Sequence, residues 1–131
     1  MERSLFSARY CFVENLFRSG LLQPCEYYIL DQWFNVSLPS ATVDLIIYLQ
    51  SNPDVVFDRI KKRARPEERA ITLDYLHTLH QLHEDWLVHK KFPLPAEVLI
   101  IDANTPLDQI VSIYEQKTDG ILSHFEGSLD N

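Results

Sequence analysis

A short, uniformly apolar segment near the middle of the chain constrains its fold most strongly. Residues Leu45 to Leu49 read Leu-Ile-Ile-Tyr-Leu with no polar alternation, a pattern typical of a strand buried on both faces of a parallel α/β sheet. A second such strand, Val98 to Ile101, ends at Asp102. The segments between them are too long for hairpins, so we expect parallel strands joined by right-handed crossovers and flanked by helices.

Capping residues and prolines predict helices around these strands. The first expected helix covers residues 5–19, with Ser4 as its cap and Gly20 at its end, and the second begins at Pro24. A third begins at Asn52 and ends at about Ala64, because Pro66 stops it. A fourth runs from Thr72 to about Lys91, and a fifth begins after Thr105. The first helix is apolar on two sides, so it needs two neighbours. The helix from Thr72 should bury Leu76, Leu79, Leu82 and Trp86, and the last helix should bury Leu107, Ile110, Val111 and Tyr114.

Half of the chain's 12 lysines and arginines lie in one cluster, although the net charge is -7. The cluster comprises Arg59, Lys61, Lys62, Arg63, Arg65 and Arg69. Such a local concentration in an acidic chain indicates an anion held at one place. Arg59 and Arg63 share a helix face, and guanidinium groups bind phosphate bidentately. The alternative is a solvated helix end whose cations complement the helix dipole.

Composition narrows the classes of function. A chain of 131 residues with 46% hydrophobic residues and three glycines is expected to form one globular unit. Its acidic total argues against general nucleic-acid or membrane-surface binding, and no apolar run approaches the roughly 20 residues that span a bilayer. With no secretory leader, we interpret Cys11 and Cys25 as buried reduced thiols of an intracellular protein.

The histidines of the helix from Thr72 allow a metal-site interpretation. His77, His80 and Glu84 share a face, but the order His80-Gln-Leu-His83-Glu84 matches neither the HExxH nor the HxxEH zinc pattern. We therefore favour solvated or partner-facing histidines over a metal site.

Three motifs, in order along nearly the whole chain, carry a family resemblance. They are Glu2-Arg3-Ser4-Leu-Phe-Ser7-Ala8-Arg9-Tyr10-Cys-Phe12, then Arg59-Ile-Lys-Lys-Arg63-Ala-Arg65-Pro-Glu67-Glu68, then Leu79-His-Gln-Leu-His83-Glu84-Asp-Trp86-Leu. Together they resemble the deoxyribonucleoside kinases, particularly the insect multisubstrate and mitochondrial thymidine kinase members. The resemblance implies part of a parallel sheet like that of the P-loop kinases, and an ATP- and Mg²⁺-dependent transfer of the γ-phosphoryl group to the 5′-hydroxyl of a deoxynucleoside.

The resemblance also implies roles for individual residues. Glu2 would help to hold Mg²⁺, and Arg3 would approach the 5′ end of the substrate and the catalytic base. A lid over about 59–70 would bring Arg59, Arg63 and Arg65 to the nucleotide phosphates, with Arg63 and Arg65 acting in catalysis. The segment Asn104, Thr105, Pro106 and Leu107 would contact the adenine of ATP largely through its backbone.

The nucleoside pocket would be formed by Ser7, Ala8, Phe12 and Glu68. The resemblance implies that Phe12 stacks on the base and that Glu68 binds the sugar 3′-hydroxyl. Ala8 stands where deoxycytidine kinase carries an Asp, which favours a pyrimidine-preferring, thymidine-accepting pocket. Purely structural alternatives remain open for three of these residues. In them, Phe12 belongs to the hydrophobic core, Arg3 forms a salt bridge near Glu2, and Glu68 pairs with Arg65.

The chain departs from the family pattern in one respect. Its 131 residues contain no Gly-x-x-x-x-Gly-Lys-Ser/Thr phosphate loop and no strand carrying the family's catalytic Glu. We therefore expect a truncated gene model, a splice product or an expressed fragment with negligible turnover on its own.

Partners and compartment follow as further expectations. The resemblance implies a homodimer through helices about 5–19 and 72–91, and a cytoplasmic or mitochondrial location. A catalytically silent product that binds a full-length kinase through those helices is the second hypothesis. An RNA contact by the arginine cluster is the third.

Overall fold

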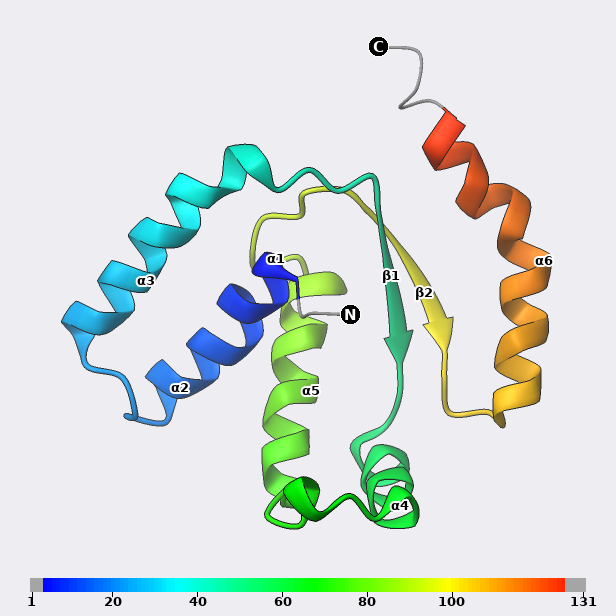
Figure 1. Cartoon of the computed structure of the whole chain (residues 1–131), viewed down its shortest axis with the longest axis horizontal. Coiled ribbons are helices and arrows are strands. Elements are labelled where there is room, and N and C mark those ends of the chain that lie inside the picture. The colour runs from blue at the N-terminus through cyan, green and yellow to red at the C-terminus, as the bar shows by residue number, and fades with distance from the viewer. Residues whose placement is uncertain (1–3, 127–131) are drawn as a thin grey trace.

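The computed structural model describes residues 4–126, and their side chains through Ser123, so the predictions for Glu2 and Arg3 lie outside the described residues. Figure 1 shows a mixed α/β arrangement with a central pair of strands. The elements are α1 (Leu5–Ser7), the π-helix η1 (Ala8–Val13), α2 (Glu14–Arg18), α3 (Pro24–Ser37), η2 (Leu38–Ser40), β1 (Leu45–Gln50), α4 (Pro53–Arg63), η3 (Pro66–Glu68), α5 (Leu73–Leu87), β2 (Glu97–Asp102) and α6 (Leu107–Glu126).

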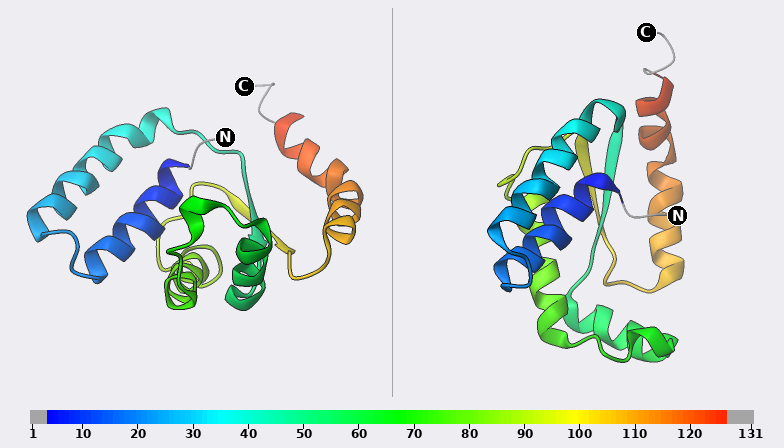
Figure 2. Two further views of the ribbon diagram at one scale, coloured as in Figure 1. Left: turned by 60° about the horizontal axis from the view of Figure 1, so that its bottom comes forward. Right: turned by 60° about the vertical axis from the view of Figure 1, so that its left-hand side comes forward.

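The two strands are parallel, which confirms the predicted α/β sheet. Leu45 lies opposite Glu97 at one end of the ladder, and Gln50 lies opposite Asp102 at the other. Figure 2 shows α6 on one side of the strands, with the N-terminal helices and α5 on the other. Helices therefore lie against both faces of the sheet, but the prediction of fully buried strands is correct only in part, because Leu49 is 47% and Ile100 39% exposed.

The core lies between the sheet, the N-terminal helices and α5. It consists of Phe6, Tyr10, Cys11, Phe34, Tyr48, Leu82, Trp86 and Leu87. The Tyr10 ring lies at its centre, with its centroid 5.3 Å from that of Phe34 and 5.5 Å from that of Trp86. The Trp86 indole N–H donates to the carbonyl of Pro93 at 3.3 Å, so this large buried ring leaves no unpaired donor.

The first helix has the expected ends but an unexpected middle. The Ser4 hydroxyl accepts from the Ser7 N–H at 3.1 Å, and Gly20 ends the helix at a φ of +75°, a value that glycine adopts without strain. Between these ends, η1 is a π-helix, which we did not predict. It contacts both α3 and α5, so the prediction that this helix needs two neighbours is confirmed.

The helix from Thr72 ends earlier than predicted. Its start is as expected, since the Thr72 hydroxyl accepts from the Tyr75 N–H at 3.2 Å. Its end is Leu87 and not Lys91, because the chain turns at Lys90, whose φ is 54°. The N–H of Lys91 then donates to the carbonyl of Asp85 at 2.8 Å, which closes the turn.

The predicted buried stripe of the last helix is correct only in part. Ile110 is buried and Tyr114 is half-buried, but Leu107 is 76% exposed and Val111 is 48% exposed. The helix meets the sheet mainly along β2, so one line of side chains suffices for that contact. The predicted Thr105 cap is also wrong, because the Thr105 hydroxyl has no hydrogen-bond partner within residues 4–126.

Two further expectations need correction. The Asn52 side chain makes no capping bond to α4. Cys25 is a free but exposed thiol, whereas Cys11 is free and buried as expected. On α3, Leu30 and Trp33 are exposed, while Phe34 is buried, because the helix packs on the core along only one side.

Tyr48 links β1 to α5 through a hydrogen bond, and substitution of Tyr48 tests this packing. Its hydroxyl donates to Glu84 Oε1 at 2.8 Å, and burial together with this bond raises the pKa of Tyr48 above its ordinary value. Tyr48→Phe should lower the free energy of unfolding by about 1–2 kcal/mol, since it deletes one buried bond to a charged acceptor. Urea denaturation would measure the loss. Tyr28→Phe, at a 63% exposed position, is the matched control and should change nothing.

Candidate functional site: a basic helix and a loop at the carboxyl ends of the strands

The site is built where the two parallel strands end. β1 leads through a short turn into α4, and β2 leads into the loop that precedes α6. In open α/β sheets, ligands bind outside the carboxyl ends of the strands. The fold therefore places the arginine-bearing helix and the 104–107 segment at the carboxyl ends of the strands, where such a fold binds its ligand.

Helix α4 ends as the sequence predicts. Ala64 adopts a left-handed φ of 53°, and Arg65 is extended before Pro66, since a residue that precedes proline avoids helical geometry. The reversal at Ala64 turns the chain back on itself. As a result, η3 brings Glu68 close to the last turn of α4.

Arg63 and Glu68 form an ion pair across that reversal. Arg63 Nε donates to Glu68 Oε2 at 3.1 Å, and Arg63 Nη2 donates to Glu68 Oε1. The Arg63 side chain is 50% exposed, whereas that of Glu68 is 18% exposed. Glu68 thus has a local partner, as one of our alternatives held, but the partner is Arg63 and not Arg65.

A hollow of about 330 Å³ opens beside residues 59–70, the predicted lid. Its lining residues are Phe57, Ile60, Lys61, Ala64, Arg65, Glu68, Arg69 and Ile71. Cationic groups from Lys61, Arg65 and Arg69 line it together with apolar side chains. Within this hollow, Glu68 is the one acidic lining residue, so its electrostatics favour an anion.

Helix α4 is also bonded to the 104–107 loop. Arg59 Nη2 donates to the carbonyl oxygen of Thr105 at 3.0 Å. The structure thereby joins two predicted nucleotide-contacting positions that are far apart in the sequence.

Asn104 makes a second connection, which the sequence analysis missed. Its side-chain oxygen accepts from the backbone N–H of Asn52 at 2.7 Å. Its backbone N–H and its Nδ2 both donate to Asp102 Oδ1, at 2.9 and 2.7 Å. An Asp at the end of a strand with an Asn two residues later indicates such an Asx turn, but the partner at Asn52 is visible only in the fold.

The predicted nucleoside-binding residues Ser7, Ala8 and Phe12 lie on the first helix. Ala8 and Phe12 belong to the π-helix η1, and π-helical turns occur frequently at functional sites. Phe12 is half-buried and packs against the core. None of these three residues lines the hollow beside the lid, which Glu68 does line.

A buried ionic network fixes η1 against α3. Arg9 donates to Asp31 Oδ1 at 2.9 and 2.6 Å and to the Tyr27 hydroxyl at 2.8 Å, and Tyr27 in turn donates to Glu14 at 2.9 Å. Burial lowers the pKa of Arg9, but these hydrogen bonds outweigh burial, so its pKa is raised overall. This network immobilises the segment that carries Ala8 and Phe12.

Comparison with known proteins identifies the family. Residues 1–126 match the family model described as deoxynucleoside kinase. The chain belongs to the deoxynucleoside kinase family. Its relatives include the mitochondrial thymidine kinase 2 of Homo sapiens, with 46% identity over 94% of this chain and 48% of that protein. Deoxycytidine kinase 2 of Gallus gallus is 38% identical over 79% of this chain and 43% of its own length.

Coverage of the relatives is partial. A mitochondrial deoxyguanosine kinase of Xenopus laevis is 37% identical over 68% of this chain and 35% of its own length. The chain spans about half the length of the thymidine kinases that it matches.

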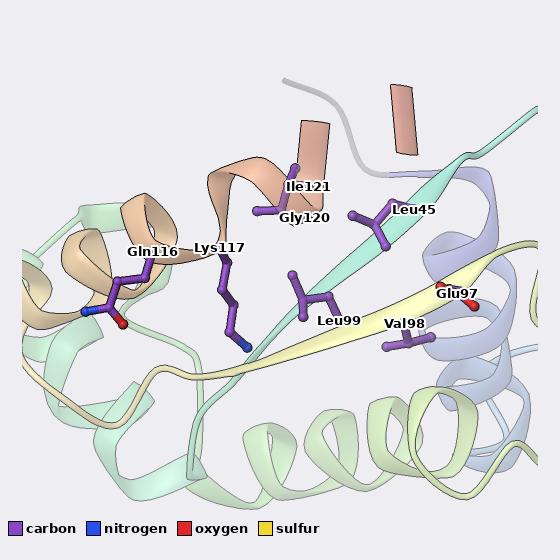
Figure 3. A pocket seen from close by; sticks show the side chains of 8 residues that line it. All are labelled: Leu45, Glu97, Val98, Leu99, Gln116, Lys117, Gly120 and Ile121. Atoms are coloured by element: carbon purple, nitrogen blue, oxygen red, sulfur yellow. The ribbon is translucent and has the colours of Figure 1, made fainter. Parts of the chain in front are cut away.

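Other surfaces of this deoxynucleoside kinase chain lie apart from the predicted site. A hollow of about 440 Å³ lies between the strands and α6. Figure 3 shows that Leu45 and Leu99 of the strands face Ile121 of α6 there, with Lys117 extending toward β2. No predicted site residue lines it. Among the described residues, no helix is long and apolar enough to cross a membrane.

The histidine-rich helix forms no evident metal site. Within the part of the chain that the structure describes, no group of three or more His, Cys, Asp or Glu residues could hold a metal ion. His80 Nε2 lies 4.0 Å from Glu84 Oε1, and His83 Nδ1 lies 2.7 Å from the carbonyl of Leu79. The predicted Mg²⁺ contact, Glu2, lies outside the described residues.

Proposed function

We propose that these residues provide the lid, the adenine loop and part of the nucleoside pocket of a deoxynucleoside kinase. The reaction is the transfer of the γ-phosphoryl group of ATP to the 5′-hydroxyl of a deoxynucleoside, with thymidine and other pyrimidines preferred. The family match over residues 1–126 carries this proposal. The proximity of a basic helix and the 104–107 loop at the carboxyl ends of the strands supports it.

The lid arginines act on the phosphates in this proposal. Phosphoryl transfer requires positioning and neutralisation of charge more than covalent chemistry from the protein. Arg63 and Arg65 stabilise the charge on the migrating group, and Arg59 contacts the nucleotide from the same helix face. Arg3 orients the 5′-hydroxyl, and Glu2 holds Mg²⁺, whose charge neutralises the phosphates when it is bound.

Glu68 changes partner during the cycle that we propose. In the free chain it is paired with Arg63. The sugar 3′-hydroxyl competes for its carboxylate and so frees Arg63 for the phosphate. Because exposed ion pairs contribute little stability, this exchange has a small energetic cost. Phe12 stacks on the base, with Ser7 and Ala8 beside it.

A segment-exchange chimera tests the proposal. The segment of human thymidine kinase 2 that aligns with this chain is replaced by residues 1–126, and the products of incubation with MgATP and each deoxynucleoside are separated by chromatography. We expect thymidine 5′-monophosphate to form, together with deoxycytidine 5′-monophosphate at a lower rate. A folded chimera that yields no monophosphate would refute the assignment, with the unmodified human enzyme as positive control.

We also propose a homodimer through helices about 5–19 and 72–91. The two segments contact each other through η1, α2 and α5, and both leave apolar side chains at the surface, with Leu16 38% and Tyr75 37% exposed. The same surface allows the alternative in which the chain, itself catalytically silent, binds a full-length kinase. We propose a cytoplasmic or mitochondrial location, the latter because the human relative is named as mitochondrial.

A charge placed on this surface tests the dimer. Leu16→Glu should weaken the dimer by about tenfold or more, since burying an unpaired carboxylate at an interface costs at least the 1.4 kcal/mol that corresponds to tenfold. Sedimentation equilibrium would measure the dissociation constant. Leu107→Glu, at a 76% exposed position on α6, is the control and should leave dimerisation unchanged. A wild-type chain that sediments as a monomer at all concentrations would contradict the proposal.

A further inference from the structure

Two separate contacts link the 104–107 loop to the lid helix α4. One is the bond from the Asn52 N–H to the Asn104 side chain, and the other is the bond from Arg59 to the Thr105 carbonyl. We propose that Asp102 and Asn104 are positioning residues that couple the loop to the lid, so that nucleotide in the loop sets the orientation of the lid arginines. This inference rests on the proposed role of the loop in adenine binding.

Asp102, where the coupling begins, is held rigidly by the sheet. Asp102 is the last residue of β2 and lies opposite Gln50 in the ladder. The next residue, Ala103, is buried, and its N–H donates to the carbonyl of Gln50 at 2.7 Å. The carboxylate of Asp102 is therefore presented from the sheet and not from a loop.

Asp102 fixes the orientation of the Asn104 amide. One carboxylate oxygen of Asp102 accepts from both the backbone N–H and the Nδ2 of Asn104. With its Nδ2 held in this way, Asn104 directs its side-chain oxygen at the N–H of Asn52. The loop therefore anchors the residue that precedes α4, while the Asn52 side chain itself makes no capping bond.

The two anchors act on one face of α4. Asn52 immediately precedes the first helical residue, Pro53, and Arg59 lies seven positions further along, which is close to two full turns. When the loop moves toward adenine, it therefore displaces α4 at two points on the same side of the helix. Arg63 lies one turn beyond Arg59, so the same displacement reorients it.

Amide hydrogen exchange on the complete 131-residue chain tests the coupling. In the absence of ligand, Asn104→Ala should accelerate exchange of the Asn52 amide by about tenfold or more, because that N–H loses its acceptor. In the chimera with human thymidine kinase 2, MgATP should slow exchange of the α4 amides near Arg63, and Asn104→Ala should abolish most of that protection. Asn35→Ala, which removes an amide side chain from α3, is the matched control and should change neither measurement.

A reciprocal exchange separates positioning from general structural damage. In the double variant Asp102→Asn with Asn104→Asp, the new Asn donates to the new Asp, which still accepts from the Asn52 N–H. This variant should restore slow exchange at Asn52 and the response of α4 to MgATP. Asp102→Ala alone, which removes the acceptor of both Asn104 bonds, should not.

The outcomes distinguish the coupling from the proposed function. If Asn104→Ala leaves exchange of the Asn52 amide and of α4 unchanged in the absence of ligand, the coupling is overturned whatever the chain binds. If that exchange accelerates as expected but MgATP protects no part of residues 4–126 in the chimera, the mechanical link stands and adenine binding by the loop is refuted. Protection of the loop without protection of α4 would overturn the coupling alone.

Discussion

Arg63→Ala in the chimera is expected to lower kcat for thymidine phosphorylation by on the order of 10²- to 10³-fold, the loss typical when one preorganised charge-stabilising group is removed. The side chain is half exposed and its ion pair with Glu68 lies near the surface, so the fold should survive the change. Initial rates at saturating MgATP and thymidine measure the effect, and the unchanged melting temperature of the variant confirms that it is folded.

Two variants sharpen the interpretation of that loss. Lys62→Ala removes the same charge from the neighbouring exposed position on α4 and should change kcat by no more than about twofold. Arg63→Lys keeps the charge but loses the planar bidentate geometry, so its activity should fall between the two. Equal losses in Arg63→Ala and Lys62→Ala would show that only the general positive potential matters, and would contradict a specific role for Arg63.

Trp86→Ala is expected to lower the free energy of unfolding by about 3–5 kcal/mol, the usual loss for truncation of a buried aromatic residue. Trp86 is 3% exposed, contacts the Tyr10 ring and donates to Pro93. Domains of this size are stable by only about 5–15 kcal/mol, so the variant should lose a large part of its stability. Urea denaturation followed by circular dichroism gives the value.

Trp33 provides the matched control for that prediction. It lies on α3 and is 68% exposed, so Trp33→Ala should change the free energy of unfolding by no more than about 0.5 kcal/mol. Comparable losses for the two tryptophans would contradict the position of the core between the sheet, the N-terminal helices and α5.

The parts of the fold that could be predicted depend on local chemistry. Unbroken apolar runs identified both strands, and the same lack of alternation indicated that helices cover both faces. The end of α4 followed from the restriction that Pro66 places on Arg65. The cap at Thr72 followed from a hydroxyl next to a helical repeat. Each of these signals requires only a few neighbouring residues.

The missed features depend on contacts between distant segments or on backbone states that sequence patterns do not specify. The helix at Thr72 stops short because Lys90 adopts a positive φ, which its residue type does not demand. The π-helix η1 consists of ordinary helix-forming residues whose periodicity predicts a regular helix. Leu107 was expected to be buried, but α6 presents only one line of side chains to β2.

The candidate site was predicted unevenly for the same reason. The arginine cluster stands out by composition, but the partner of Glu68 depends on the left-handed turn at Ala64, which brings Arg63 within reach. The bonds from Arg59 to Thr105 and from Asn52 to Asn104 join positions that are 46 and 52 residues apart. No local pattern encodes such pairings, whereas the parallel strands place both segments at one sheet edge.

Photoaffinity labelling of the chimera with 8-azido-ATP tests whether the basic helix and the 104–107 loop form one nucleotide site. The azide is carried by the adenine ring, and mass spectrometry locates the labelled peptide. We predict labelling within residues 102–107 that excess ATP prevents and that Arg63→Ala weakens. Labelling that occurs only outside residues 102–107 and 59–70, with the chimera folded and ATP still competing, would contradict it.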